Sequence, residues 1–375
     1  MSERVLVLGA GFGGLELATV LSEELGDEAG VTVVEAADAF VFGYSKLDIL
    51  FGRAEPAAVS VSYSTFQKPG VRLVRERVTS IDPEAKRVST DAGEHEADVL
   101  VLALGAAYDV DATPGVSDSE FYSVAGAERL RGSVATFTSG RAVVGVCGAP
   151  FKCPPAPSEA ALLLHDLLVE RGVRDACEIA VAMPFPTPVP PSPDASKALM
   201  AAFAERGIEF VGERRPVSYD AGSGIVVLDD GAELACDLFL GVPKHRAPVV
   251  VLESGLAEDG FVPVDSRTLE TRFPNVFAVG DVANVGVPKA GVLAEREARV
   301  VAANIIARRR GEEPAARFDG RGSCYVEFGA GRVGRIDVDF LSGPEPTGAL
   351  VGPSAELAEE KREFGASRAA RWLGT

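Results

Sequence analysis

The feature that most constrains this chain is a glycine-rich turn between an apolar run and a helical pattern near its start. Residues 4–8 form a short apolar run, which is typical of a buried parallel strand. Gly9, Gly11 and Gly14 follow it in a Gly-x-Gly-x-x-Gly spacing, and Glu35 ends the next apolar run. The pattern predicts a dinucleotide fingerprint. It combines a tight turn, a close approach to pyrophosphate, a helix packed on a strand and a carboxylate for a ribose hydroxyl.

Strand and helix patterns then alternate along the chain, which predicts a doubly wound α/β fold. We expect strands at 31–34, 98–105, 141–147, 177–182 and 275–281, and helices at 15–25, 158–171, 291–309 and 357–373. The predicted architecture is two Rossmann-like domains of the FAD/NAD(P)-binding type with a small C-terminal α+β cap domain. The expected divisions are 1–110 and 245–315 for the two halves of the FAD-binding domain, 111–244 for the second Rossmann-like domain and 316–375 for the cap.

Composition limits the kinds of partner. The chain has 375 residues and a net charge of −18, so phosphate backbones would repel it and we expect no nucleic acid partner. No apolar run approaches the roughly 18 residues of a spanning helix, and no signal peptide is visible. Five cysteines in so long a chain do not suggest a disulfide scaffold. We expect a soluble cytoplasmic enzyme that is at most peripheral at the inner face of the membrane, and a homodimer is an open alternative to a monomer.

A second motif predicts which dinucleotide is bound. The segment 271–281, which ends in Gly280 and Asp281, resembles the second FAD motif of the two-dinucleotide-binding-domain flavoproteins. Ala103-Leu-Gly105 resembles their middle motif, with leucine in place of the usual threonine. The resemblance implies FAD, with Asp281 on its ribityl chain. Lys289, just before the helix at 291–309, is expected to add positive charge beside the flavin; the alternative is a solvated surface lysine.

The second unit lacks the matching fingerprint. Aligning its first strand with that of the first unit puts Gly145, Cys147 and Pro150 at the three glycine positions. A cysteine side chain would obstruct the pyrophosphate, and proline has no N–H to donate. We therefore expect no NAD(P)H binding in the standard mode.

A cysteine loop takes the place of that fingerprint. The segment from Lys152 and Cys153 to Glu159, Lys-Cys-Pro-Pro-Ala-Pro-x-Glu, resembles the active-site cysteine segment of the flavoprotein subunit of flavocytochrome c sulfide dehydrogenase. The sulfide:quinone oxidoreductases resemble it more loosely. By that resemblance Cys153 and Cys324 form a disulfide or polysulfide-bridged pair over the flavin, which sulfide opens to deliver two electrons. Flavocytochrome members attach FAD to an early cysteine; none precedes Cys147 here, so FAD is expected to be non-covalent.

The expected roles follow from thiol chemistry. A thiolate is the reacting species, so positive charge beside the two cysteines is needed, and Lys152 is the candidate source. Glu159 is the candidate acid or base. Cys147 is expected to pack beneath the loop. Cys177 and Cys236 are expected in the core, and the three histidines (His95, His165 and His245) show no metal-ligand spacing.

The predicted function is a FAD-dependent sulfide, persulfide or thiol oxidoreductase that passes electrons to a quinone or a protein. One alternative is an NAD(P)H-dependent quinone or ferredoxin-type reductase; another is a flavin-binding thiol redox sensor. Two segments stay open. The proline-rich run 184–193 is either a wall or lid of the second unit or a plain connector. The helix at 357–373 is expected to dock on the protein or form a dimer contact, rather than anchor in a membrane interface.

Overall fold

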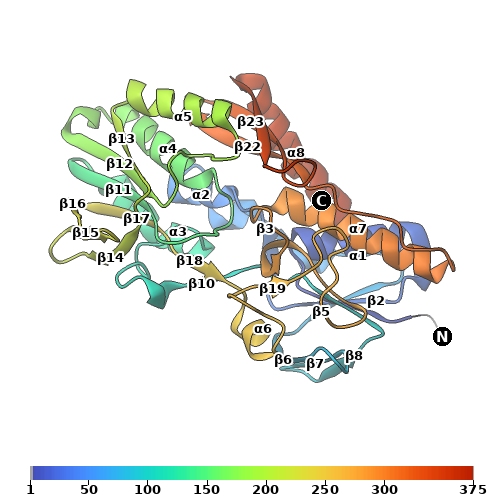
Figure 1. Ribbon diagram of the computed structural model, residues 1–375. Coiled ribbons are helices and arrows are strands. Elements are labelled where there is room, and N and C mark those ends of the chain that lie inside the picture. Colours follow the sequence, from blue (N-terminus) through green and yellow to red (C-terminus); the bar gives the residue numbers. More distant parts are fainter. Residues whose placement is uncertain (1–2, 375) are drawn as a thin grey trace.

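The computed structural model describes residues 3–374 and is built on two parallel β-sheets, one for each Rossmann-like unit (Figure 1). Two central strands of the first sheet, Val5–Leu8 and Val99–Leu102, are short apolar runs in which every residue is buried, whereas the edge strand Val71–Arg75 is partly exposed. The strand order of this sheet is β20 (Val276–Ala278), β9 (Val99–Leu102), β1 (Val5–Leu8), β2 (Val31–Glu35) and β5 (Val71–Arg75). Two long helices, α1 (Phe12–Leu25) and α7 (Gly291–Arg309), pack against each other beside this sheet.

The second sheet repeats this plan with four parallel strands. Their order is β13 (Ile208–Gly212), β12 (Cys177–Met183), β11 (Gly140–Val146) and β17 (Leu238–Val242). The helices of this unit are α3 (Val124–Thr136), α4 (Ala156–Glu170) and α5 (Pro193–Glu205). The predicted α/β class with two Rossmann-like units is confirmed.

Each unit inserts a three-stranded antiparallel sheet before one of its parallel strands. In the first unit β6 (Val78–Asp82), β7 (Arg87–Thr90) and β8 (Glu94–Glu96) precede β9. In the second, β14 (Pro216–Asp220), β15 (Ile225–Leu228) and β16 (Glu233–Ala235) precede β17. The duplication therefore includes the connections as well as the sheets.

The chain crosses between the units at one antiparallel ladder, where β10 (Ala107–Asp109) pairs with β18 (Lys244–Arg246). The chain leaves the first unit through β10 and returns to it through β18, so we propose that the units divide near residues 110 and 244. The remaining short elements of the first unit are α2 (Ser45–Leu50), α6 (Val249–Glu253) and the strand pairs β3 (Ala39–Val41) with β4 (Ser60–Ser62) and β19 (Val262–Pro263) with β21 (Ala283–Asn284).

The C-terminal region adds an antiparallel sheet and a long helix that returns to the first unit. The sheet contains β22 (Arg321–Gly329), β23 (Arg332–Asp339) and β24 (Thr347–Ser354), and α8 (Ala355–Leu373) follows it. The end of α8 packs on α1, with Trp372 and Leu373 each 1 % exposed. The expected docking of this helix is confirmed, and these two side chains form no exposed membrane anchor.

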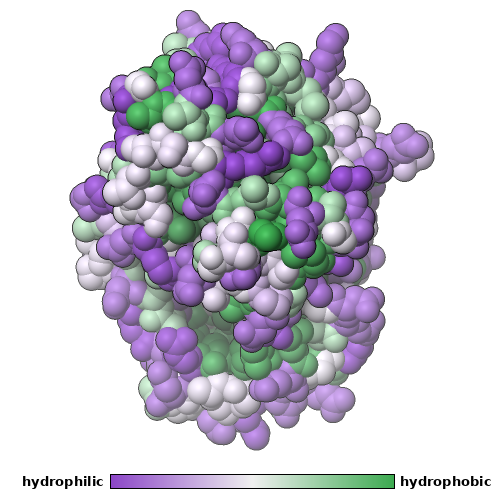
Figure 2. All heavy atoms as spheres, turned by 90° about the vertical axis from the view of Figure 1, so that its left-hand side faces the viewer, coloured by the Kyte–Doolittle hydropathy of each residue, from purple (hydrophilic) through white to green (hydrophobic). Residues whose placement is uncertain are grey.

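Two details refine the sequence-based expectations. Helix α7 begins and ends at the predicted residues, whereas α1 begins at Phe12, three residues before the predicted start, because Gly11 is its N-cap. The proline-rich run packs between the second unit and the C-terminal sheet. Phe185 stacks on Phe151 with 6.1 Å between ring centroids, and Pro191 lies beside Gly348 of β24. Figure 2 shows the face on the second unit's side, where hydrophilic side chains surround hollows with hydrophobic walls.

Candidate active site

A cavity of about 560 Å³ joins the first unit, the second unit and the C-terminal region. Its walls include the fingerprint glycines at the end of β1, the loop before α4, and residues of β22 and α8. Cavities of this size are typical of cofactor and substrate sites. The predicted residues that line it are Gly9, Gly11, Glu35, Gly105, Lys152, Cys153, Glu159, Gly280, Asp281, Lys289 and Cys324.

The glycine turn has the shape that a pyrophosphate requires. A Cβ on Gly14 would lie 1.9 Å from the carbonyl oxygen of Gly9, so the third glycine permits the helix to pack on the turn. A Cβ on Gly11 would meet nothing within 4 Å, so that position faces open space. No side chain caps the first N–H groups of α1, which are therefore available to an anion. These residues fit the pyrophosphate of FAD.

Glu35 stands at the end of β2, where its carboxylate is fixed by two backbone donors. The N–H of Ala10 donates to Oε2 at 2.8 Å and the N–H of Ala37 donates to Oε1 at 2.7 Å. Carboxylates accept more than two hydrogen bonds, so capacity for a ribose hydroxyl remains. The ribose role of Glu35 stays a prediction.

Glu297, a residue that the sequence analysis missed, supports the turn at Gly280. Its Oε2 accepts the Gly280 N–H at 2.6 Å, and burial raises the pKa of this carboxyl to about 7. Lys289 is also buried, so the alternative of a solvated surface lysine is wrong. Its Nζ donates to the carbonyl of Ala283 at 3.0 Å and lies 3.6 Å from the centroid of the Phe261 ring.

The backbone of Lys289 holds the cysteine loop in place. The N–H of Cys153 donates to the carbonyl of Lys289 at 2.9 Å, which ties the loop before α4 to the segment before α7. Cys153 has φ +53°, a left-handed conformation that is strained for a residue with a side chain. Such strain is found preferentially at functional sites.

Cys153 and Cys324 are free thiols that line the same cavity. Burial raises the pKa of the Cys153 thiol to about 12, and the charges of Glu159 and Cys324 add to the rise. Burial, followed by the charge of Glu159, raises the pKa of Cys324 to about 12. The positive charges that oppose the rise at Cys153 belong to Lys361 and Lys46, two further residues that the sequence analysis missed.

A buried charge network surrounds Glu159. Its Oε1 accepts the N–H of Glu327 at 2.9 Å and lies 3.9 Å from Nζ of Lys361. Nζ of Lys361 lies closer to Oε1 of Glu327, at 2.6 Å, and Arg53 contacts the other oxygen of Glu327 at 2.7 Å. Burial raises the pKa of Glu159 to about 7. A carboxyl with this pKa can exchange a proton near neutral pH.

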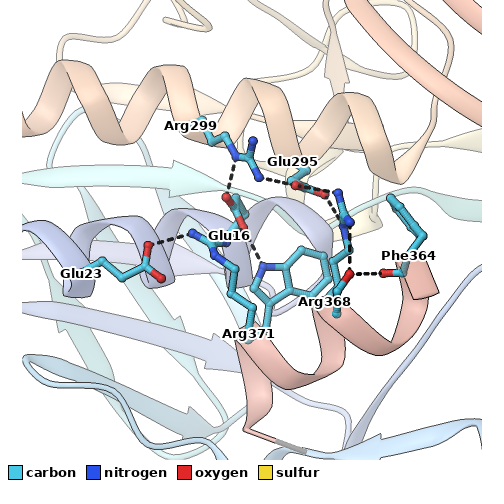
Figure 3. Close-up of polar contacts among 9 residues, drawn as sticks. Glu16, Glu23, Glu295, Arg299, Phe364, Arg368 and Arg371 are labelled. Carbon is cyan, nitrogen blue, oxygen red and sulfur yellow. Dashed lines mark hydrogen bonds and ion pairs between the residues drawn. The ribbon is translucent and has the colours of Figure 1, made fainter. Parts of the chain in front are cut away.

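Helix α8 brings Lys361 and Phe364 to the cavity and is fixed by a second charge network (Figure 3). Glu16 of α1 is fully buried and accepts hydrogen bonds from Nε of Arg299 at 2.6 Å, from Arg371, and from the indole N–H of Trp372 at 2.6 Å. Glu295 of α7 joins the network through Arg299 and Arg368. Three helices are thus connected through two buried carboxylates.

The corresponding turn of the second unit is packed differently from the turn after β1. A Cβ on Gly145 would lie 2.5 Å from Cε2 of Phe239, so this glycine serves side-chain packing. Cys147 is 1 % exposed and packs in the core beneath the loop, as expected. The expected lack of a standard NAD(P)H site stays a prediction.

Of the remaining cysteines and histidines, Cys177, Cys236 and His245 are buried, and the structural role expected of the whole set stays a prediction. Cys177 and Cys236 are buried in core clusters. His95 pairs with Glu76 at 2.7 Å, and His245 is buried with Nδ1 at 2.8 Å from the carbonyl of Pro243. Within residues 3–374, no three His, Cys, Asp or Glu side chains are grouped to hold a metal ion.

Comparison with known proteins places the chain among flavoenzymes. The family model for pyridine nucleotide-disulphide oxidoreductases matches residues 3–303. The mitochondrial sulfide:quinone oxidoreductase of Mus musculus is 27 % identical over 363 residues, which cover 92 % of this chain and 79 % of that protein. The type II NADH:quinone oxidoreductase of Staphylococcus saprophyticus is 27 % identical over 305 residues, 74 % of each chain.

A solved structure shows the same fold. The sulfide:quinone oxidoreductase of Aquifex aeolicus superposes with a TM-score of 0.86 at 22 % identity, over 99 % of this chain and 92 % of that one. In the part of the chain that the structure describes, no helix is both long and apolar enough to cross a membrane.

Proposed function

This chain belongs to the pyridine nucleotide-disulphide oxidoreductase family, and on that premise we propose that it is a FAD-dependent oxidoreductase that oxidises sulfide. Electrons would pass to a quinone or an electron-transfer protein. The observation that carries the proposal is that Cys153 and Cys324 line the same cavity as the fingerprint turn at Gly9 and Gly11. The sulfide:quinone oxidoreductases of Mus musculus and Aquifex aeolicus support the proposal, because their sequences align with most of this chain.

The cavity residues fit FAD in non-covalent form. Gly9 and Gly11 would hold its pyrophosphate at the start of α1, and Gly14 lets that helix pack on the turn. Glu35 would hold a ribose hydroxyl and Asp281 the ribityl chain. When bound, FAD supplies a two-electron acceptor.

The chain's own residues account for the sulfur chemistry. In the oxidised enzyme, hydrosulfide attacks one sulfur of a Cys153–Cys324 disulfide; a new S–S bond forms as the bond between the cysteines breaks. One cysteine becomes a persulfide and the other leaves as a thiolate. The carboxylate of Glu159, with its pKa of about 7, accepts the proton that the persulfide releases. Lys46 and Lys361 stabilise the departing thiolate when it is Cys153.

Two competing functions stay open to test. The type II NADH:quinone relatives favour an NAD(P)H-dependent reductase. The packing of Gly145 against Phe239 argues against it. A thiol redox sensor would turn over slowly with every donor. The cytoplasmic location and a possible homodimer stay predictions.

The test is to mix the purified flavoprotein with sulfide or NADH without oxygen and to follow the flavin absorbance. We expect rapid bleaching by sulfide alone, lost in Cys153→Ser and in Cys324→Ser. Cys147→Ser is the matched control, because this thiol is buried away from the cavity, and it should bleach as the parent does. Bleaching by NADH alone would replace the proposal with the reductase, and slow reaction with both donors would favour the sensor.

A further inference from the structure

Lysine is concentrated in the cavity of an otherwise acidic protein. The chain has eight lysines and a net charge of −18, and four of the eight line the cavity: Lys46, Lys152, Lys289 and Lys361. A concentration of one sign of charge in a concave site raises the local concentration of ligands of opposite charge.

Two of these four ammonium groups lie within 3.0 Å of a carboxylate or carbonyl oxygen. Lys361 pairs with Glu327 at 2.6 Å, and Lys289 donates to the carbonyl of Ala283 while resting on the Phe261 ring. Lys46 and Lys152 differ from them. Within residues 3–374, neither has a carboxylate oxygen within 4.0 Å of its Nζ.

The surroundings of Lys46 leave its charge uncompensated. Burial and then the charge of Lys152 lower the pKa of Lys46 to about 7, while Cys153, Asp281 and Glu120 act in the other direction. Glu120 is already engaged, because its carboxylate accepts the backbone N–H groups of Tyr122 and Ser123. Two like charges held together beside a thiol are favourable when an anion lies between them.

Lys152 is held beside the same thiol by its place in the chain and by an aromatic ring. Its Nζ lies 4.5 Å from the centroid of the Tyr108 ring, and the backbone of its segment forms a bridge with that of Lys289. An ammonium group in this position retains its charge, because Tyr108 and Asp281 raise its pKa against the effect of burial.

We propose that Lys46 and Lys152 form a binding subsite for the hydrosulfide anion beside Cys153. This inference rests on the proposed function and specifies the form of the substrate: the ion HS⁻ binds, in preference to neutral H₂S. The two ammonium groups attract the anion into the cavity, and they keep the sulfur ionised as it approaches the cysteine.

The test measures charge preference at Cys153 without sulfide and without turnover. Iodoacetate and iodoacetamide alkylate thiolates and differ in charge. In the flavin-loaded Cys324→Ser protein, mass spectrometry gives the alkylation rate of Cys153 with each reagent, below the Lys46 pKa of about 7. Any change in the thiolate fraction affects both reagents equally, so the ratio of the two rates reports the attraction of the anion alone.

We expect Lys46→Gln to lower this iodoacetate-to-iodoacetamide ratio about tenfold, as loss of a nearby unit charge requires. Lys46→Arg should keep the ratio within about twofold, because the charge remains. Lys197→Gln, which removes an exposed lysine of α5 outside the cavity, should leave it unchanged. An unchanged ratio in Lys46→Gln would overturn the subsite.

If Lys46→Gln does not fold, salt provides the second measurement. The ratio in the parent protein should fall steadily between about 0.01 M and about 1 M salt, because ions screen the lysines. A ratio that is flat with salt contradicts the proposal. Sulfide that fails to bleach a protein with a clear iodoacetate preference would refute the proposed function and leave the anion preference standing.

Discussion

Oε1 of Glu159 lies 3.9 Å from Nζ of Lys361, yet the pKa of this carboxyl is raised to about 7 rather than lowered. Burial is the main cause of the rise, and Lys361 opposes it only in part because its ammonium group is nearer to Glu327, at 2.6 Å, which Arg53 also contacts. Arg53 and Lys361 overcome the effect of burial and lower the pKa of Glu327 to about 2, so Glu327 carries the charge that balances Lys361. Glu159 is therefore the member of the network that is free to exchange a proton.

The pH dependence of sulfide-driven flavin reduction should follow Glu159. The carboxyl is protonated below about pH 7 and becomes a base above it, so its contribution to the rate should grow as pH rises through 7. We expect Glu159→Gln to lower the rate about a hundredfold at high pH and much less at low pH. Anaerobic stopped-flow measurements across pH give the ratio of wild-type to variant rates.

Glu128→Gln is the control for this change, because Glu128 is an exposed residue of α3. It should match the wild type at every pH. A wild-type to Glu159→Gln ratio that does not depend on pH would remove Glu159 from the proton transfer.

Two glycines of the fingerprint should fail in different ways when a methyl group is added. Gly14→Ala places a Cβ 1.9 Å from the carbonyl oxygen of Gly9, so the free energy of unfolding should fall by about 1–3 kcal/mol even without flavin. Gly11→Ala meets no protein atom within 4 Å, so the flavin-free fold should keep its stability while FAD binding is lost. Urea denaturation of the flavin-free proteins measures the change in stability. The ratio of flavin absorbance, at about 450 nm, to protein absorbance, at about 280 nm, measures the bound FAD.

The five cysteines should divide into a reactive pair and a protected set. Cys147, Cys177 and Cys236 are at most 4 % exposed, so only Cys153 and Cys324 should react with iodoacetamide in the folded reduced protein. Because burial raises both pKa values to about 12, the rates should still rise at pH 10, where a thiol with the ordinary value of 9.0 has nearly levelled off. A plateau near pH 9 in the folded flavin-free protein would contradict this.

The single tryptophan should report the docking of α8. Glu16→Gln removes the charge that Arg299 and Arg371 contact, and we expect it to lower the free energy of unfolding by about 2–4 kcal/mol. Trp372 fluorescence should then shift to longer wavelength at a lower urea concentration than in the parent. Glu23→Gln removes a half-exposed partner of Arg371 and should cost less than about 1 kcal/mol.

Local patterns were sufficient to predict much of this fold. The strand, the glycine turn and the helix of the fingerprint are adjacent in the sequence, and so their type follows from apolar runs and glycine spacing. The bounds of α7 were predicted because an apolar pattern follows a proline and a glycine there. The position of Cys153 at the end of β11 followed from the rule that doubly wound sheets place their sites at carboxyl ends of strands.

The lysines of the cavity could not be predicted in the same way. Lys46 is the second residue of a six-residue helix and Lys361 lies within α8, and neither belongs to a motif. Their approach to Cys153 depends on how separate elements pack around one cavity, and single-sequence patterns do not contain that information. The burial of Lys289 could not be predicted either, because it depends on the packing of its side chain against Phe261 and on a hydrogen bond to Ala283.

The bond between Glu16 and Trp372 has a consequence for the order in which the protein is made. These residues are 356 positions apart, and the other ligands of Glu16 come from positions 299 and 371. Once residues 1–110 have been synthesised, the buried carboxylate of Glu16 still lacks the cations and the indole donor that contact it, because these come from positions 299, 371 and 372. The charge network around Glu16 can therefore be completed only after α8 has been synthesised.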